Sequence, residues 1–477
     1  MFNNIIYRIM GQASTRSFKS KRLYQKAGPR MYQQMQAYLS KEIYPFHMPG
    51  HKGNPMFIPQ GLAKLDLTEI PGMDVLHKPT GIIGQLQESI ADFYGADESH
   101  LLVNGSTAGI VSAISALCGE GRRIYAARNG HVSMYNGIAL SGAVPIYLVP
   151  EKTPDGLTGG IKPELLDNME EGAVVFIVSP TYEGFVSDIK EIAARVHSCG
   201  GVLIVDEAHG AHFKFSDTFP VSALDLGADI VVQSFHKTLP ALGQMAVLHV
   251  KGTRIDRHRL RYFLQVLQTS SPSYMLMGQL DYILQMLWKR PEIFEAYVSR
   301  LKGLRMALAN SDGLAIILSG RERVGQCGIY DIDPGKLLFN TNTEYKAEFI
   351  AEKLASQYRI QIEMAYREHL LAMTTVADTD EGMQRLWGAI GSLNIKMEDI
   401  HYEPENHIRT PRKLPEMVLT PGQAMGQEAE VVPWKMALGR ISGEMLVVLP
   451  PGIPMVVPGE RIPKGLMKLA PEVRVLK

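Results

Sequence analysis

Seven short apolar runs, separated by stretches of helical character, dominate the chain from about residue 98 to residue 250. This alternation is typical of a mainly parallel β-sheet covered by helices. The helical character is clearest at Ile189, Ile192, Ala193 and Val196, which share one helix face before a Gly-Gly pair ends the pattern. The predicted strands lie at residues 101–103, 124–126, 146–149, 174–178, 202–205, 230–232 and 245–248. The sequence therefore predicts an α/β domain with its ligand site at the strand ends.

The pattern changes twice beyond this domain. It becomes helical over residues 257–289 and 292–309, and from about residue 310 it mixes strands and helices. A further helix is expected over 31–39, behind a basic N-terminal stretch. We predict three parts, which are a basic N-terminal extension with a helix (1–45), a large α/β domain (46–310) and a smaller C-terminal α+β domain (311–477).

Charge balance and cysteine content limit the functional classes. The 49 Lys and Arg residues equal the 49 Asp and Glu residues, so the bulk charge does not indicate a nucleic-acid partner. No apolar run approaches the roughly 20 residues that cross a bilayer, so we expect no membrane association. The three cysteines are far apart, which argues against a disulfide framework and indicates a reducing compartment. These features favour a cytoplasmic enzyme that acts on a small molecule.

The basic N-terminal stretch has two interpretations. Lys and Arg residues recur from Arg8 to Arg30, and no acidic residue precedes Glu42. A basic, serine-containing stretch is compatible with a targeting presequence, although it lacks the apolar region of a secretory signal. The alternative is a poorly ordered tail that leads into the first helix.

Ser-Phe-His-Lys at 234–237 places polar groups directly after the apolar run 230–232. A strand that ends in a hydroxyl, an imidazole and an ammonium group delivers these groups to the carboxyl end of the sheet. Lys237 is thus a candidate for a lysine that forms an imine. Alone, it could equally be a surface lysine, because an ordinary lysine pKa of about 10.4 makes a poor nucleophile at neutral pH.

Asn-Gly-Ser-Thr at 104–107 follows the first predicted strand and opens a helical stretch that runs to Leu117. Backbone N–H groups at a helix start, together with two hydroxyls, form a cradle suited to a phosphate. The spacing matches neither the dinucleotide nor the P-loop pattern. Ser106 and Thr107 could also be ordinary helix caps.

Asp206 ends another apolar run and is followed by Glu207, His209 and His212. A carboxylate at this place can face a ring nitrogen and keep it protonated, at the same sheet edge as Lys237. Metal binding by this acidic and histidine-rich segment is an alternative, but no HExxH-like spacing occurs. His209 could also be a structural histidine.

His131 follows a third strand and could stack on an aromatic cofactor, or be an ordinary loop histidine. Together, a phosphate cradle, a stacking imidazole, a strand-end aspartate and a strand-end lysine are the set that binds pyridoxal 5′-phosphate. We therefore predict this cofactor, and we predict no metal.

At this point the chain resembles the Orn/Lys/Arg decarboxylase family, the short form of which lacks an N-terminal wing. The matching segments are 46–53, 104–107, 206–212, 234–242, 269–274 and 450–454. The resemblance implies a fold-type-I pyridoxal-phosphate enzyme, with a mostly parallel seven-stranded sheet in the large domain. The chain departs from the family pattern at Val132 and Gly243, so the resemblance does not determine the local geometry of the phosphate site.

The resemblance implies a role for each matching residue. Lys237 would be the Schiff-base lysine, Asp206 the partner of the pyridinium nitrogen and His131 the stacking group, with Ala208 on the other face of the ring. His209, His131 or Lys237 itself would return a proton to the substrate. Phosphate contacts would come from Gly105, Ser106, Thr107, Ser234, His236 and Ser270 of the partner subunit, because family sites lie at the interface of a homodimer or dimer-based oligomer.

The implied activity is decarboxylation of a basic amino acid in polyamine metabolism, with arginine as the first choice and then lysine or ornithine. Glu69, Asp74 and Glu444 are candidates to bind the distal cation of the substrate, and each could equally be a structural or solvated acid. The nearest alternative is a fold-type-I aminotransferase or lyase, in which Arg409, Arg412 or Arg440 would bind the α-carboxylate. A non-catalytic descendant of the fold is a further alternative.

Overall fold

We analysed a computed structural model of the chain, which describes residues 31–41, 65–309, 316–341, 347–393, 414–448, 452–466 and 468–477. The basic N-terminal stretch and the segment 46–53 lie outside the described residues. Helix α2 (Met31–Leu39) confirms the first predicted helix.

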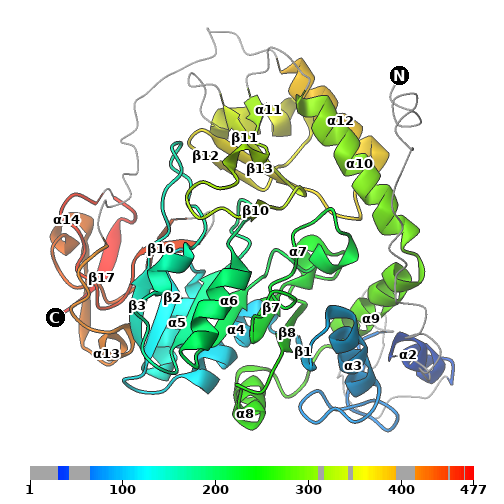
Figure 1. Cartoon of the computed structure of the whole chain (residues 1–477), viewed down its shortest axis with the longest axis horizontal. Coiled ribbons are helices and arrows are strands. Elements are labelled where there is room, and N and C mark those ends of the chain that lie inside the picture. The colour runs from blue at the N-terminus through cyan, green and yellow to red at the C-terminus, as the bar shows by residue number, and fades with distance from the viewer. Residues whose placement is uncertain are drawn as a thin grey trace, which may run out of the picture.

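The seven predicted strands are all present and form one sheet (Figure 1). Its order is β1-β8-β7-β6-β4-β2-β3. Strands β3, β2, β4, β6 and β7 are parallel, and β8 is antiparallel to both of its neighbours. The strands are β1 (Glu98–Leu102), β2 (Arg123–Ala127), β3 (Val144–Leu148), β4 (Val174–Val178), β6 (Val202–Asp206), β7 (Ile230–Gln233) and β8 (Ala246–Val250).

Both faces of this sheet are buried, because alternate side chains of a strand point to opposite faces. In β4, Val175 and Ile177 join the core on one face, whereas Val174 and Phe176 join the core on the other. Each such fully buried side chain stabilises the fold by about 1.5–3 kcal/mol. Helices on the first face are α3 (Ile82–Tyr94), α6 (Ile189–Ser198) and α9 (Tyr274–Lys289), and those on the second are α4 (Gly105–Leu117), α5 (Val132–Ser141) and α8 (Arg257–Leu267). The core of the first face continues into α10 (Glu292–Ala309).

A second, antiparallel sheet of four strands follows α10, in the order β12-β13-β11-β9. The short strand β10 (Asp331–Ile332) pairs with β5 (Phe185–Val186) of the large domain and so ties the two regions together (Figure 1). The elements of this region are β9 (Ile316–Leu318), β11 (Lys336–Thr341), β12 (Met364–Tyr366), β13 (His369–Met373), α11 (Ala347–Tyr358) and α12 (Asp380–Ser392).

The last described part has its own small core around Trp434, Val473 and Val475. It is fixed to the large domain by a buried ion pair, in which Arg128 Nη2 lies 3.1 Å from Glu460 Oε2. The boundary predicted near residue 310, between the large domain and the C-terminal domain, stays a prediction. The elements here are α13 (Pro421–Met425), α14 (Trp434–Ala437), β14 (Ala429–Pro433), β15 (Leu446–Val448), β16 (Ile453–Val456) and β17 (Glu472–Leu476).

None of the helices that the structure describes is long and apolar enough to span a membrane. The described part of the chain also holds no group of three or more His, Cys, Asp or Glu side chains placed to bind a metal ion.

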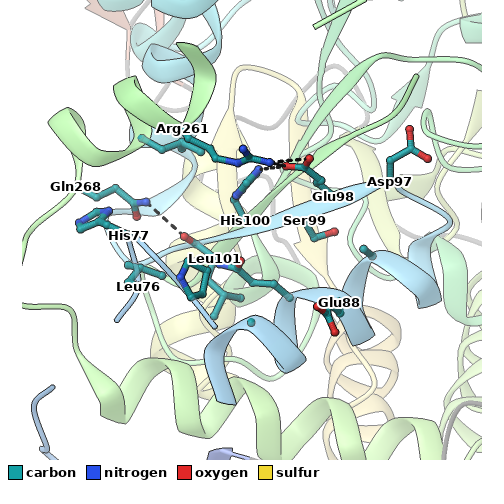
Figure 2. Close-up of a pocket in the computed structure, with 15 residues that line it drawn as sticks. Leu76, His77, Glu88, Asp97, Glu98, Ser99, His100, Leu101, Arg261 and Gln268 are labelled. Atoms are coloured by element: carbon teal, nitrogen blue, oxygen red, sulfur yellow. Dashed lines mark hydrogen bonds and ion pairs between the residues drawn. The ribbon is translucent and has the colours of Figure 1, made fainter. Parts of the chain in front are cut away.

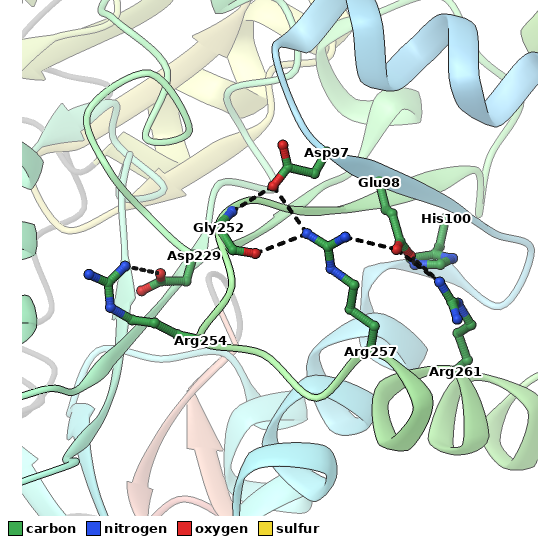
Figure 3. Close-up of polar contacts among 8 residues, drawn as sticks. All are labelled: Asp97, Glu98, His100, Asp229, Gly252, Arg254, Arg257 and Arg261. Atoms are coloured by element: carbon green, nitrogen blue, oxygen red, sulfur yellow. Dashed lines mark hydrogen bonds and ion pairs between the residues drawn. The ribbon is translucent and has the colours of Figure 1, made fainter.

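An ion-pair network anchors α8 to the edge of the seven-stranded sheet (Figure 3). Arg261 Nη2 donates to both carboxylate oxygens of Glu98, at 2.8 and 2.9 Å. Arg257 lies 3.2 Å from the same carboxylate and 3.1 Å from Asp97, and His100 lies 3.3 Å from Glu98. The hydrogen bond from His100, and then that from Arg261, lower the pKa of Glu98 from 4.5 to about 2, against the effect of burial.

Glu98→Gln is expected to reduce the acid sensitivity of folding. Because the folded-state pKa of Glu98 is depressed, its stabilisation is fully present above about pH 4.5 and is lost as the pH falls towards 2. The difference corresponds to at most about 3 kcal/mol. Urea unfolding at pH 6 and pH 3 should show a smaller loss of stability in the variant. Glu88→Gln is the control, because this exposed acid on α3 has no ion pair among the described residues, and an unchanged pH dependence in Glu98→Gln would contradict the expectation.

Candidate active site

Asp206 and Lys237 lie at the same edge of the sheet, as predicted from the sequence. Asp206 is the last residue of β6, and Lys237 lies in the short helix α7 (Phe235–Thr238), directly after β7. The two strands are parallel neighbours, with Asp206 opposite Val232. Their carboxyl ends therefore deliver an acid and an amine to one place.

The start of α4 fits a phosphate group. Asn104 occupies the N-cap position and its side chain makes no capping hydrogen bond, so Ser106 and Thr107 lie in the first turn and are not caps. Gly105 has a φ of +74°, and a Cβ atom there would lie 3.7 Å from the carbonyl oxygen of Gln244. The helix start thus offers backbone N–H groups that the Asn104 side chain does not cap.

Ser234 and His236 are the other residues of this chain predicted to contact the phosphate. Met245, the residue after Gln244, accepts a hydrogen bond from the His236 ring at 2.9 Å, which brings α7 to the same place as Gly105. Ser234 Oγ is fully buried and has no hydrogen-bond partner in the described part of the chain. A buried hydroxyl without a partner is costly, and a bound phosphate oxygen would satisfy it.

Asp206, His131 and Lys237 influence one another electrostatically. Burial raises the pKa of the Asp206 carboxyl, while Lys237 and His131 lower it, and Asp206 Oδ1 accepts a hydrogen bond from the Ala208 N–H at 3.1 Å. His131 caps α5 and is exposed, with Nδ1 2.9 Å from Ser133 Oγ. The pKa of the His131 imidazole lies below its ordinary value. Desolvation by the surrounding protein is the main cause, the Asp206 carboxylate opposes it, and the charge of Lys237 adds to it.

His209 lies between two lysines. Its Nε2 atom lies 3.2 Å from Lys237 Nζ, and its Nδ1 atom lies 2.8 Å from Lys336 Nζ. Sequence reasoning missed Lys336, which begins β11 in the second sheet and is only 3% exposed. The available signal was a lysine at the head of an apolar run, where a buried strand normally has an apolar side chain.

Tyr182 and Glu363 form the rim of this cluster and were also missed. The Tyr182 hydroxyl donates to Glu363 Oε1 at 2.6 Å, and the edge of its ring packs against His209. Glu363 is exposed, and its charge raises the pKa of both Lys237 and Lys336 against the effect of burial. It therefore places a carboxylate within electrostatic reach of Lys237.

Two of the three acids predicted for the distal cation accept backbone hydrogen bonds, and the third is exposed. Asp74 is buried and accepts backbone hydrogen bonds at the start of α3, from Val75, Thr80, Gly81, Ile83 and Gly84. Glu444 accepts a hydrogen bond from the Arg474 N–H at 2.7 Å, and Glu69 is exposed. Among the described residues, no hydrogen bond or ion pair joins these three acids to Lys237.

Two further predicted groups can be located. Ser270 is exposed, and the neighbouring Thr269 N–H donates to Asn104 Oδ1 at 3.2 Å, so the segment runs past the phosphate cradle of its own chain. Arg440 is engaged by Glu430 at 2.7 Å. Arg409 and Arg412 lie outside the described residues.

A pocket of about 290 Å³ lies apart from these strand ends, between α3, β1 and α8 (Figure 2). Arg261 and Glu98 pair at one side of it, and Gln268 donates to the Leu101 carbonyl oxygen at the other. None of the predicted cofactor residues lines it. We assign no role to this pocket.

Comparison with known proteins identifies related chains. The family model described as the Orn/Lys/Arg decarboxylase major domain matches residues 29–349, and that of the C-terminal domain matches residues 405–469. Arginine decarboxylase of Bacillus subtilis is 32% identical over 449 residues, 91% of each chain. Arginine decarboxylase of Halalkalibacterium halodurans is 33% identical over 435 residues, 87% of each chain. The structure of E. coli constitutive lysine decarboxylase shares the fold, with a TM-score of 0.80 and 19% identity over 94% of this chain and 82% of that one.

Proposed function

The chain belongs to the Orn/Lys/Arg decarboxylase family, and on that premise we propose that it converts arginine to its amine and CO₂ with pyridoxal 5′-phosphate as cofactor. Membership makes the protein a decarboxylase of a basic amino acid with the α/β fold of fold-type-I enzymes. Arginine is the proposed substrate because the relatives at 32% and 33% identity are named arginine decarboxylases. Lysine and ornithine are the next candidates.

The observation that carries the proposal is the convergence of Lys237, Asp206 and the Ser234 hydroxyl at one sheet edge, where that hydroxyl has no partner among the described residues. Lys237 would hold the cofactor covalently, Asp206 would face its ring nitrogen, and His131 and Ala208 would lie against the two faces of the ring. The α4 start, Ser234 and His236 would hold its phosphate. When bound, the cofactor supplies an electron sink for the bond to the departing carboxylate.

The chain's own residues would orient the substrate and move protons. Asp206 is buried, so it can present a fixed negative charge where water does not screen it. Lys237 Nζ and His209 Nε2 are 3.2 Å apart, so a proton can pass between them. Lys237, His209 or His131 would return a proton to the substrate carbon.

Glu363 is our added candidate for the distal cation of the substrate. It is exposed at the rim, is fixed by the Tyr182 hydroxyl and acts electrostatically on Lys237. Glu69 and Glu444 remain candidates from the chain position alone. Asp74 is the least supported, because five backbone N–H groups already occupy its carboxylate.

The family resemblance further supports a role in polyamine metabolism, a cytoplasmic location and a homodimer or dimer-based oligomer. In that dimer, Ser270 of the partner subunit would contact the phosphate. These statements are proposals that follow from the resemblance.

Incubation with arginine, lysine and ornithine, in the presence of the cofactor, tests the activity and the substrate together. We expect CO₂ and the corresponding amine in equal amounts, with kcat/KM at least about tenfold higher for arginine than for the other two, since one well-placed charged contact discriminates to this extent. Keto acid without CO₂ would favour an aminotransferase. Faster turnover of lysine or ornithine would contradict the choice of arginine as substrate but not the decarboxylase activity.

Glu363→Gln should raise KM for the preferred substrate about tenfold and change kcat little, because it removes a contact that is equally strong in the bound substrate and the transition state. Glu352→Gln is the matched control, since this exposed acid lies on α11 of the same region. An unchanged KM in Glu363→Gln would return the role to Glu69 or Glu444.

A further inference from the structure

Lys336 is a buried basic residue that the proposed chemistry does not yet use. It enters the site from β11 of the second sheet, and its Nζ atom lies 2.8 Å from His209 Nδ1. Gly184, with a φ of +97°, makes room for it, because a Cβ atom there would lie 2.8 Å from Lys336 Cγ. The chain is thus shaped to bring this lysine against His209.

The two contacts of His209 limit the charges of both lysines. A neutral imidazole carries one N–H and one acceptor nitrogen, and an ammonium group can only donate hydrogen bonds. The lysine that faces the ring N–H must therefore accept a hydrogen bond through its lone pair, which only a neutral amine can do. With an imidazolium ring, both lysines would have to be neutral. In neither case can Lys336 and Lys237 both be ammonium groups.

The surroundings of Lys336 indicate that Lys336, rather than Lys237, is the lysine that carries the positive charge. Its Nζ atom lies 5.4 Å from the centroid of the Tyr182 ring, a cation–π arrangement. Burial lowers the pKa of Lys336, and the carboxylates of Asp333, Glu363 and Glu183 partly offset this effect. The resulting pKa of about 8 leaves the group mainly protonated at neutral pH. Burial and then the charge of Lys336 lower the pKa of His209 well below 6.5, so its ring is neutral.

We propose that Lys336 is a positioning residue that donates to His209 Nδ1, so that His209 carries its proton on Nε2 and holds Lys237 as a neutral, nucleophilic amine. This inference rests on the proposed role of Lys237 in attaching the cofactor. The charged and titratable groups that act on these three residues are Asp206, Glu183, Asp333, Glu363, His131, His212 and His236. The second sheet thereby sets the protonation state of an amine in the large domain.

The reactivity of Lys237 in the cofactor-free, full-length chain tests the proposal without using decarboxylase activity. Trace acetylation with isotope-labelled acetic anhydride, read by peptide mass spectrometry from pH 6 to pH 11, gives the pH midpoint at which Lys237 becomes neutral. Lys336→Met keeps the stem of the side chain and removes its charge. We expect the midpoint to rise by about one pH unit, so that acetylation at pH 7.5 slows about tenfold.

His209→Asn supplies a second variant that leaves Lys336 in place and retains an acceptor for it. Because Lys237 loses its donor, its midpoint should rise by a similar amount, and the double variant should add little to either single change. Lys214→Met is the matched control, since Lys214 pairs with Asp225 away from the cluster. In this variant, the acetylation midpoint of Lys237 should equal that of the unmodified chain. An unchanged or lower midpoint in folded Lys336→Met or His209→Asn protein would overturn the proposal, whatever the enzyme's substrate.

Discussion

Replacing Lys237 with alanine is expected to lower kcat/KM by at least about 1,000-fold and to abolish the absorbance band of the covalently held cofactor. Lys237 supplies the amine that we propose attaches the cofactor, and we propose that its Nζ atom, 3.2 Å from His209 Nε2, also takes part in proton transfer. Alanine removes both functions. Absorbance spectroscopy of the purified protein and CO₂ release from arginine measure the two effects separately.

Lys251→Ala is the matched control for this loss. Lys251 is a partly buried lysine that follows β8 in the same sheet and donates to the Leu224 carbonyl oxygen. Because β8 runs antiparallel to β7, its end lies at the opposite edge of the sheet from Lys237. We expect full cofactor absorbance and near-normal turnover in this variant. Substantial decarboxylation by Lys237→Ala protein would refute the role proposed for Lys237.

The large sheet was predictable because its central strands are buried on both faces. Parallel strands covered by helices on both sides appear in the sequence as short continuous apolar runs, and the seven runs correspond to the seven strands. Asp206 and Lys237 were predictable for the same reason, since a polar residue directly after such a run lies at a known edge of the sheet. The helix over Ile189–Ser198 followed from its spacing alone.

Lys336 and Glu363 could not be found in this way. They reach Lys237 because β10 pairs with β5 and brings the second sheet against the large domain. That pairing joins residues about 145 positions apart, and it leaves no periodic signal in the sequence. Contacts between regions depend on tertiary packing, which short patterns do not encode.

Asp74 illustrates a different limit. In sequence it is an acid in a loop rich in proline and glycine, compatible with either substrate binding or a structural role. In the structure its carboxylate collects backbone N–H groups from residues 75 to 84 and fixes the start of α3. These hydrogen bonds depend on the path of the loop, and the identity of the residue does not reveal that path.

Asp206→Asn is expected to lower kcat by about 100- to 1,000-fold without lowering stability. The amide has nearly the same shape, but it carries no charge to hold a proton on the ring nitrogen of the cofactor. Because burial raises the pKa of Asp206, its ionised form disfavours folding as the pH rises above the ordinary carboxyl pKa, and the neutral amide relieves this penalty. Thermal unfolding of the variant at pH 7.5 should therefore show an unchanged or higher Tm. A lower Tm would indicate that activity is lost because the protein unfolds.

The same variant has an effect of opposite sign to that of Lys336→Met. The Asp206 carboxylate raises the pKa of Lys237, so its removal should lower the acetylation midpoint of Lys237 in the cofactor-free chain. Asp225→Asn is the control, because this exposed acid pairs with Lys214 and should leave the midpoint unchanged. A higher midpoint in Asp206→Asn would show that Asp206 does not act on Lys237 as a negative charge. If Asp206 lowers and Lys336 raises the fraction of neutral Lys237, two opposing charges from different sheets together determine the protonation state of this amine.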